Sequence, residues 1–189
     1  MVKLNKIYTR TGDDGTSGLV DGGRASKAGL RMTAIGEVDE ANSLIGVAIA
    51  ALDDEQAILA DRLRLIQNEM FDLGADLATP GEIDGALRIT AGQVTRVEGG
   101  IDVMNADLAP LTSFILPGGS GAVAALHVAR AVVRRAERAA VALSANEPVN
   151  HHAIAYLNRL SDHLFVAARS VAAAEGGDVL WQPGATRGQ

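Results

Sequence analysis

Apolar residues recur at alternating spacings of three and four in five stretches of the chain. This spacing places apolar side chains on one stripe of an α-helix, and two such stripes pack together at a shallow crossing angle. The stripes extend over residues 34–52, 59–77, 94–108, 122–143 and 154–171. The pattern predicts an all-α fold, a five-helix bundle that follows a polar segment.

Helix-breaking residues separate the later stripes, with prolines at positions 80, 110, 117 and 148. Proline stops a helix, and joints this short favour antiparallel neighbours. Gly99 and Gly100 fall inside the third stripe, where each glycine costs about 1 kcal/mol relative to alanine and lowers the helical propensity. The tail, residues 176–189, is predicted to be irregular, with Trp181 docked on the surface.

The composition narrows the class of protein. A length of 189 residues suffices for one domain over residues 1–189. The composition, with 48% hydrophobic but only 3% aromatic residues, favours closely packed helices. A net charge of −6, from 17 Lys and Arg against 23 Asp and Glu, disfavours binding to nucleic acid or anionic membranes. The absence of cysteine excludes disulfides and thiolate metal sites and fits a cytoplasmic location. No apolar stretch is long enough for a secretion signal or a membrane span.

A glycine-rich segment, residues 1–29, precedes the first stripe. Within it Gly12, Gly15 and Gly18 alternate with hydroxyl side chains, and Lys27 follows. Several backbone N–H groups of such a segment can face one anion, so its composition is typical of a phosphate cradle. Its spacing matches neither the Walker A loop nor the dinucleotide fingerprint. The alternative is a flexible arm that is disordered without a ligand because it has few apolar anchors.

Cationic side chains form a stripe on the fourth predicted helix, at His127, Arg130, Arg134 and Arg138. Guanidinium groups stacked on adjacent turns attract a polyanion, although a solvated helix face is the ordinary explanation of such a run. On the first predicted helix Asp39 could meet an arginine of another helix or subunit, either as an ion pair that fixes helix register or as part of a catalytic site.

The sequence does not point to a metal site built from its own side chains. Its four histidines are scattered, and the adjacent His151 and His152 begin a predicted helix, where they can face solvent. The Glu-x-x-His pairs of a di-iron centre do not occur.

Six motifs follow one another along the chain: Lys6-Ile-Tyr-Thr-Arg-Thr-Gly-Asp-Asp-Gly15, Gly36-Glu-Val-Asp-Glu-Ala-Asn-Ser43, Phe114-Ile-Leu-Pro-Gly-Gly119, His127-Val-Ala-Arg130, Arg134-Arg-Ala-Glu-Arg138 and Tyr156-Leu-Asn-Arg-Leu-Ser-Asp162. Together they resemble the PduO-type ATP:cob(I)alamin adenosyltransferases, a family of corrinoid adenosyltransferases. The resemblance covers nearly the whole chain in the family's order, and the combination of motifs makes it specific.

The resemblance implies a ferritin-like, cobalamin adenosyltransferase-like five-helix bundle that assembles as a homotrimer with active sites between subunits. It implies transfer of the 5′-deoxyadenosyl group of ATP to cob(I)alamin, giving adenosylcobalamin and triphosphate, with Mg²⁺ as cofactor. An electron donor and an adenosylcobalamin-dependent enzyme are the implied partners. The alternative is a non-catalytic module that binds ATP or adenosylcobalamin and delivers the cofactor.

The matched motifs also imply site residues. The residues expected to bind ATP are Thr9, Arg10, Thr11, Gly12, Ser17, Gly18, Lys27, Arg134, Arg135, Ala136, Glu137, Arg138 and Asn158. The catalytic set is Arg134, Phe114, Asp39 and Arg130. In this set Phe114 occupies the lower face of the corrin, and Asp39 pairs with Arg130 across the subunit boundary. The chain departs from the family at Ala41, where leucine is frequent, and at Arg10 and Asp14, where lysines are common.

Overall fold

The computed structural model describes residues 7–187 and contains five long helices. They are α1 (Leu30–Ala51), α2 (Ala57–Leu77), α3 (Ala91–Asn105), α4 (Gly121–Ser144) and α5 (His151–Ala174). A short 3₁₀ helix, η1 (Asp54–Gln56), precedes α2, and two strands, β1 (Thr16–Gly18) and β2 (Arg24–Ser26), precede α1. The predicted all-α five-helix bundle is confirmed. Lys6, the first residue of the arm motif, lies outside the described residues.

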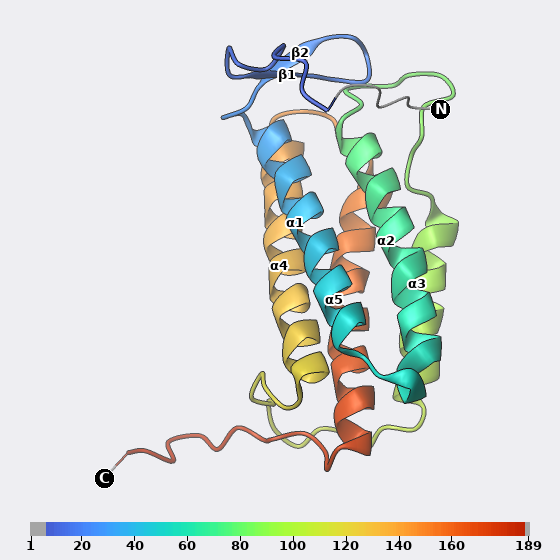
Figure 1. Cartoon of the computed structure of the whole chain (residues 1–189), viewed down its shortest axis with the longest axis vertical. Coiled ribbons are helices and arrows are strands. Elements are labelled where there is room, and N and C mark those ends of the chain that lie inside the picture. The colour runs from blue at the N-terminus through green and yellow to red at the C-terminus, as the bar shows by residue number, and fades with distance from the viewer. Residues whose placement is uncertain (1–6, 188–189) are drawn as a thin grey trace.

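The helices run side by side, and each is antiparallel to the next along the chain (Figure 1). The most extensive packing joins α1 to α4, and α4 also packs on α5. On the other side α2 packs mainly on α1, whereas α3 packs mainly on α5. The strands lie over the end of the bundle where α1 begins, and the loop between α3 and α4 lies at the opposite end (Figure 1).

Small side chains allow α1 and α4 to approach closely. On α1 the fully buried alanines include Ala34, Ala41 and Ala48, and α4 buries Ala129, Ala136 and Ala140 in the same way. Ala41, the departure from the family's leucine, is therefore one of several fully buried alanines on these two helices. Close packing of this kind fixes which face of each helix points outward, because burying one side of α4 leaves the residues at the intervening angles on the surface.

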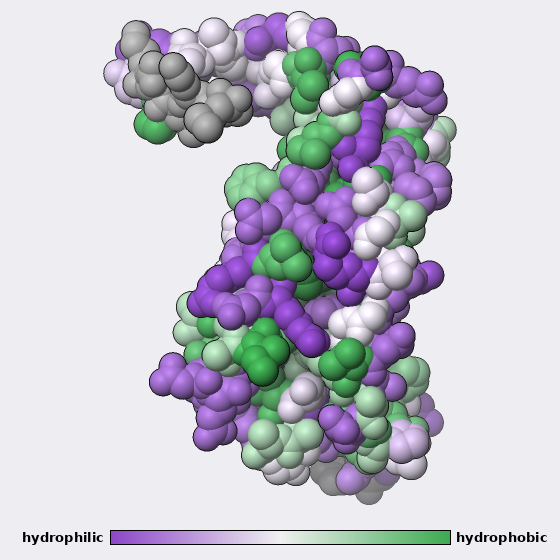
Figure 2. Space-filling view, turned by 90° about the vertical axis from the view of Figure 1, so that its right-hand side faces the viewer, coloured by the Kyte–Doolittle hydropathy of each residue, from purple (hydrophilic) through white to green (hydrophobic). Residues whose placement is uncertain are grey.

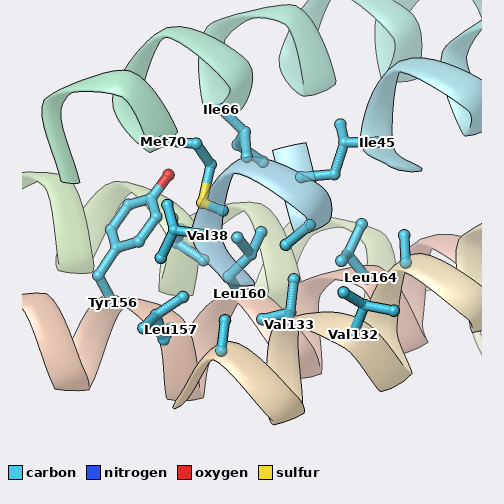
Figure 3. Packing of buried hydrophobic residues seen from close by; sticks show 14 of the residues in the cluster. Val38, Ile45, Ile66, Met70, Val132, Val133, Tyr156, Leu157, Leu160 and Leu164 are labelled. Atoms are coloured by element: carbon cyan, nitrogen blue, oxygen red, sulfur yellow. The ribbon is translucent and has the colours of Figure 1, made fainter. Parts of the chain in front are cut away.

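Larger side chains fill the centre of the bundle. Figure 3 shows Met70 of α2 and Val38 of α1 beside Tyr156 and Leu160 of α5. The buried Tyr156 hydroxyl donates a 2.8 Å hydrogen bond to Glu69, and burial raises the pKa of Tyr156 well above its ordinary value. The phenol is therefore a neutral hydrogen-bond donor in the core rather than an acid at neutral pH.

The third helix forms despite its two glycines, but it ends at Asn105, so Leu108 of the predicted stripe lies beyond it. Thr90 starts the helix with a capping box that it shares with Gln93. A Cβ at Gly100 would stand only 2.6 Å from Cε1 of His163 on α5. The close approach of α3 to α5 therefore requires glycine at position 100.

The tail contains no helix or strand up to residue 187, as predicted, but it pairs with the loop before α4. Ile115 and Leu180 form an isolated antiparallel bridge. The amide of Leu116 donates to the carbonyl of Val179 at 2.8 Å. These contacts hold the first part of the tail against the end of the bundle. No helix within residues 7–187 has the length and apolar character needed to cross a membrane.

Substituting alanine for each of the two adjacent glycines of α3 gives opposite predictions. Gly99→Ala is expected to raise the free energy of unfolding by up to about 1 kcal/mol, because nothing lies within 4 Å of its added Cβ and alanine favours the helix. Gly100→Ala is expected to lower it by about 1–3 kcal/mol, because the Cβ would overlap His163. Urea unfolding followed by circular dichroism measures both. Equal stabilities of the two variants would contradict the described α3–α5 contact.

Candidate active site

The glycine-rich arm folds as a hairpin. Strands β1 and β2 pair antiparallel, with Thr16 opposite Ser26 and Gly18 opposite Arg24. The amide of Val20 donates to the carbonyl of Ala78 at 3.0 Å, which ties the hairpin to the end of α2. The arm is thus held over one end of the bundle rather than extended away from it (Figure 1).

Two residues expected to bind phosphate meet at the start of the hairpin. The Lys27 ammonium donates to the Gly12 carbonyl at 2.8 Å, and the Gly15 amide donates to the same carbonyl at 3.2 Å. A Cβ at Gly12 would lie 3.0 Å from Lys27 Nζ and 3.1 Å from the Thr16 carbonyl. Glycine at position 12 therefore lets Lys27 approach the backbone of the loop.

Arg24, which belongs to the glycine-rich segment but is not among the predicted site residues, closes this loop. Its guanidinium donates to the Thr11 carbonyl at 2.5 Å and to the Thr16 hydroxyl at 2.7 Å. It also lies 3.5 Å from the Asp14 carboxylate. That carboxylate accepts hydrogen bonds from the hydroxyl and amide of Thr16, which lower the pKa of Asp14. These contacts give residues 11–16 a defined conformation.

The remaining arm residues are placed around the loop. The hydroxyls of Thr9 and Thr11 are hydrogen-bonded at 2.9 Å. Arg10 has a left-handed backbone, with φ at 60°, and its guanidinium lies 5.7 Å from the centre of the Tyr8 ring. Of the two residues of β1 that are expected to bind ATP, Ser17 is half-buried and Gly18 is exposed.

The cationic stripe of α4 runs from buried to exposed. His127 is buried, Arg130 is half-buried, and Arg134 and Arg138 are exposed. Arg138 donates to the backbone carbonyl of Arg134 at 2.9 Å. Neither of these two guanidinium groups forms an ion pair within residues 7–187. The outer half of the stripe therefore carries uncompensated positive charge.

Two members of the predicted ATP set differ from these exposed arginines. Arg135 forms ion pairs with Glu37 and Glu40 of α1, so its guanidinium already has two carboxylate partners. Their hydrogen bonds raise the pKa of Arg135. Ala136 is fully buried, so its side chain faces the core instead of a ligand. The side chain of Ala136 therefore gives no support to its prediction as an ATP-binding residue.

A polar contact between α4 and α5 holds Asn158. Its amide nitrogen donates to Glu137 at 2.8 Å, and its amide oxygen accepts a hydrogen bond from Arg159. Arg159 is held in turn by Glu98 of α3 at 2.8 Å. The predicted pair of Glu137 and Asn158 is therefore brought together, and three helices fix its position.

The structure does not pair Asp39 with Arg130 inside the protomer. Asp39 is exposed, and neither residue has an ion-pair partner in the described part of the chain. The Nε atom of Arg130 is buried without a hydrogen-bond partner among those residues, and desolvation lowers the pKa of Arg130. Its guanidinium lies 6.0 Å from the Phe165 ring. An aromatic face offsets part of the cost of a desolvated cation, but a carboxylate would offset more.

Phe114 lies in the loop at the other end of the bundle and is 77% exposed. Its ring centre is 6.1 Å from that of Trp181. The Trp181 amide donates to the Phe114 carbonyl at 2.7 Å, and the Ser113 hydroxyl donates to the Trp181 carbonyl at 2.7 Å. The docking of Trp181 is confirmed, and its contact is Phe114, which the sequence could not specify. An exposed aromatic pair of this kind is typical of a ligand or partner surface.

Comparison with known proteins identifies the family. The family model described as cobalamin adenosyltransferase matches residues 7–171. The corrinoid adenosyltransferase of Mycobacterium tuberculosis (strain ATCC 25618 / H37Rv) is 51% identical over 191 residues, covering 98% of this chain and 97% of that protein. The corrinoid adenosyltransferase of Bacillus subtilis (strain 168) is 46% identical over 180 residues, covering 94% and 92%.

Solved structures agree with the sequence comparisons. A variant of the PduO-type ATP:corrinoid adenosyltransferase from Lactobacillus reuteri, complexed with cobalamin and ATP, superposes with a TM-score of 0.89 at 36% identity. The match covers 94% of this chain and 97% of that one. The chain belongs to the cobalamin adenosyltransferase family, and the resemblance drawn from the six motifs is confirmed.

The described residues contain no group of three or more His, Asp and Glu side chains arranged to hold a metal ion. Mg²⁺ prefers near-octahedral oxygen ligands and is usually held by one or two carboxylates together with substrate phosphates. The described residues therefore form no Mg²⁺ site that is complete without oxygen atoms of a ligand.

Arg24 offers a direct test of how the loop is ordered. Arg24→Met is expected to lower the hydrogen-exchange protection of the Gly15, Thr16 and Lys27 amides at least fivefold, because the Thr11 and Thr16 contacts are lost. Arg64→Met, which removes an exposed arginine on α2, is the matched control and should leave these amides unchanged. Unchanged protection in Arg24→Met would show that the loop is ordered by other contacts.

Proposed function

We propose that this chain transfers the 5′-deoxyadenosyl group of ATP to cob(I)alamin and releases adenosylcobalamin and triphosphate. Membership of the cobalamin adenosyltransferase family supports this activity. The observation in the structure that carries it is the exposed pair of Arg134 and Arg138, two guanidinium groups without carboxylate partners among the described residues. Such a pair suits a polyanionic leaving group.

The proposed transfer requires no nucleophilic side chain from the protein. The reduced cobalt attacks the 5′ carbon, the bond between that carbon and the triphosphate oxygen breaks, and its electron pair leaves with the triphosphate. A chain without cysteine can therefore catalyse the transfer. The protein must align cobalt with carbon and stabilise the charge that develops on the leaving oxygen. Arg134, Arg138 and Lys27 are proposed for the second task.

The arm residues have a positioning role in this proposal. Backbone groups around Gly12, with the hydroxyls of Thr9, Thr11 and Ser17, bind the triphosphate in a loop that Arg24 already orders. The ammonium of Lys27 exchanges its contact with the Gly12 carbonyl for a phosphate oxygen. A preordered loop reduces the entropy lost when the anion binds.

The aromatic pair of Phe114 and Trp181 is proposed to cover the lower face of the corrin. A cobalt ion that keeps an axial ligand is hard to reduce, and an apolar side chain in place of that ligand and of water makes reduction easier. Phe114 is exposed enough to meet a flat macrocycle, and Trp181 supports its ring from the tail. Trp181 is thus a positioning residue in this proposal.

The distance between the two halves of the site supports a site shared between subunits, for which we propose a homotrimer. The arm lies at one end of the bundle and the Phe114 loop at the other (Figure 1). Between them runs α4, whose 24 residues span about 36 Å at 1.5 Å per residue. Reacting atoms must approach to about 3–3.5 Å. We therefore propose that the arm of one subunit and the aromatic pair of its neighbour enclose one active site.

The ion pair of Asp39 with Arg130 is proposed to form across that boundary. Each residue lacks a partner of opposite charge within residues 7–187. The guanidinium of Arg130 is already partly removed from water, which lowers its pKa. A neighbour's Asp39 would compensate this charge and close the corrin chamber. We also propose a cytoplasmic location, an electron donor that reduces the cobalt and a downstream enzyme that takes up adenosylcobalamin.

The test of the activity supplies ATP, Mg²⁺ and cob(II)alamin with a strong chemical reductant. Conversion of the corrin spectrum to that of adenosylcobalamin, with one triphosphate released per cofactor formed, is the expected result. Binding of ATP or of adenosylcobalamin without conversion would identify a delivery module instead of a transferase.

Two variants test the aromatic pair in the same assay. Phe114→Ala is expected to retain ATP affinity within about twofold and to lose at least tenfold in turnover, because water reaches the lower face. Trp181→Ala is expected to lose turnover less, since Phe114 remains but is no longer supported. Val103→Ala, an exposed apolar residue on α3, is the control. Normal turnover in Phe114→Ala would remove this role.

A further inference from the structure

Arg169, a charged residue near the end of α5, is almost completely buried. Its side chain is only 8% exposed, and its Nε atom donates a 2.9 Å hydrogen bond to the carboxylate of Asp178 in the tail. The Asp178 side chain is itself only 15% exposed. The Nη2 atom of the same guanidinium donates to the Ala109 carbonyl at 2.8 Å. Burying a cation costs free energy, and these two contacts offset that cost.

The two partners of Arg169 lie in the two segments that carry the aromatic pair. Asp178 precedes Trp181 by three residues, and Ala109 precedes Phe114 by five. Both segments lie at the end of the bundle where α5 ends (Figure 1). A guanidinium is planar and rigid, and here it binds both segments at once. Arg169 therefore fixes where the tail starts relative to the loop before α4.

Two glycines turn the tail back towards Arg169. Gly176 and Gly177 have φ angles of 108° and 93°, in the left-handed region that favours glycine. The Gly177 amide donates to the Ala172 carbonyl at 2.8 Å and so closes the end of α5. This turn brings Asp178 back to a side chain nine positions earlier in the sequence.

Few other contacts hold the tail in place. Its backbone contacts with the loop before α4 form a narrow two-stranded ribbon, and such a ribbon is marginally stable on its own in water. Its apolar side chains remain largely exposed: Val179 by 61%, Leu180 by 41% and Trp181 by 44%. Within residues 175–187 only Asp178 is not exposed. The buried ion pair is therefore the main anchor of the tail.

We infer that Arg169 and Asp178 are positioning residues for the aromatic pair. Their ion pair holds the tail in the path that brings Trp181 to Phe114. Without it the ribbon opens, Phe114 loses its support, and water reaches the lower face of the corrin, which makes the cobalt harder to reduce. The inference rests on the proposed function, because the ion pair acts only through the role of Phe114.

The first experiment follows the tail without turnover. Trp181 is the only tryptophan of the chain, so its fluorescence reports the position of the tail. Asp178→Asn keeps the shape of the side chain and removes its charge. We expect this variant to raise the acrylamide quenching constant about twofold, because a ring that is 44% exposed becomes almost fully accessible when local contacts open. Arg169→Met should give a similar rise.

The side of the bundle formed by α2 and α3 shows apolar groups interspersed with charged ones (Figure 2). A released tail would meet this mixed surface there instead of one apolar patch. Glu175→Gln is the matched control, since it removes an exposed carboxylate that forms no ion pair within residues 7–187. Circular dichroism checks that each variant keeps its helices. Quenching in Asp178→Asn equal to that of the unaltered chain would overturn the inference, whether or not Arg169→Met folds.

The second experiment separates positioning from a loss of stability by the oxidation state of the cobalt. With cob(II)alamin and a mild reductant, Asp178→Asn is expected to lose at least about threefold in turnover. With cob(I)alamin prepared in advance, its turnover should stay within about twofold of the unaltered chain, because reduction is no longer needed. The KM for ATP should not change in either case. A merely destabilised protein would lose activity with both forms of the cofactor.

The outcomes distinguish this inference from the proposed function. Turnover of the unaltered chain is the reference, so a failure of the proposed function is seen there. Normal turnover in Asp178→Asn while Phe114→Ala is impaired would overturn the inference and leave the proposed function standing. Equal losses with cob(II)alamin and cob(I)alamin would also overturn it. Normal turnover in both variants would remove the role of Phe114 and the inference with it.

Discussion

The close packing of α1 on α4 is the constraint from which the site follows. Because Ala129, Ala136 and Ala140 are buried in the bundle, the helical repeat turns Arg134 and Arg138 outward. The same contact brings two carboxylates of α1 to Arg135, so that one arginine of the cluster stabilises the bundle while its neighbours remain free. A larger side chain in this contact would displace the helices and, with them, the cationic face.

The second constraint is distance. The loop that orders phosphate-binding groups and the aromatic pair that suits a corrin lie at opposite ends of one protomer (Figure 1). Meanwhile the half-buried Arg130 has no carboxylate beside it within residues 7–187, and exposed Asp39 has no cation. Both observations support the proposal that a neighbouring subunit supplies the missing half of the site. The catalytic account therefore depends on an interface between copies of this chain.

The features of the structure that depend on local periodicity could be predicted from the sequence. The five helices follow from buried apolar residues, and the apolar stripe of α4 already contained Ala136, so its burial was predictable although the motif match grouped it with ATP. Long-range contacts could not be predicted. Arg24 binds the carbonyl of Thr11, 13 residues earlier, and Trp181 binds the carbonyl of Phe114, 67 residues earlier. Gly100 was counted against α3, yet its contact with His163 requires it.

The most direct test of the shared site mixes two charge-reversed variants. Asp39→Arg and Arg130→Asp are each expected to form little adenosylcobalamin, because like charges would meet at every boundary. Trimers assembled from both variants would bring Arg at position 39 to Asp at position 130, and the unaltered pair would meet at another boundary. The account predicts that mixing under conditions of subunit exchange restores activity. A mixture as inactive as its components, or single variants with full activity, would contradict it.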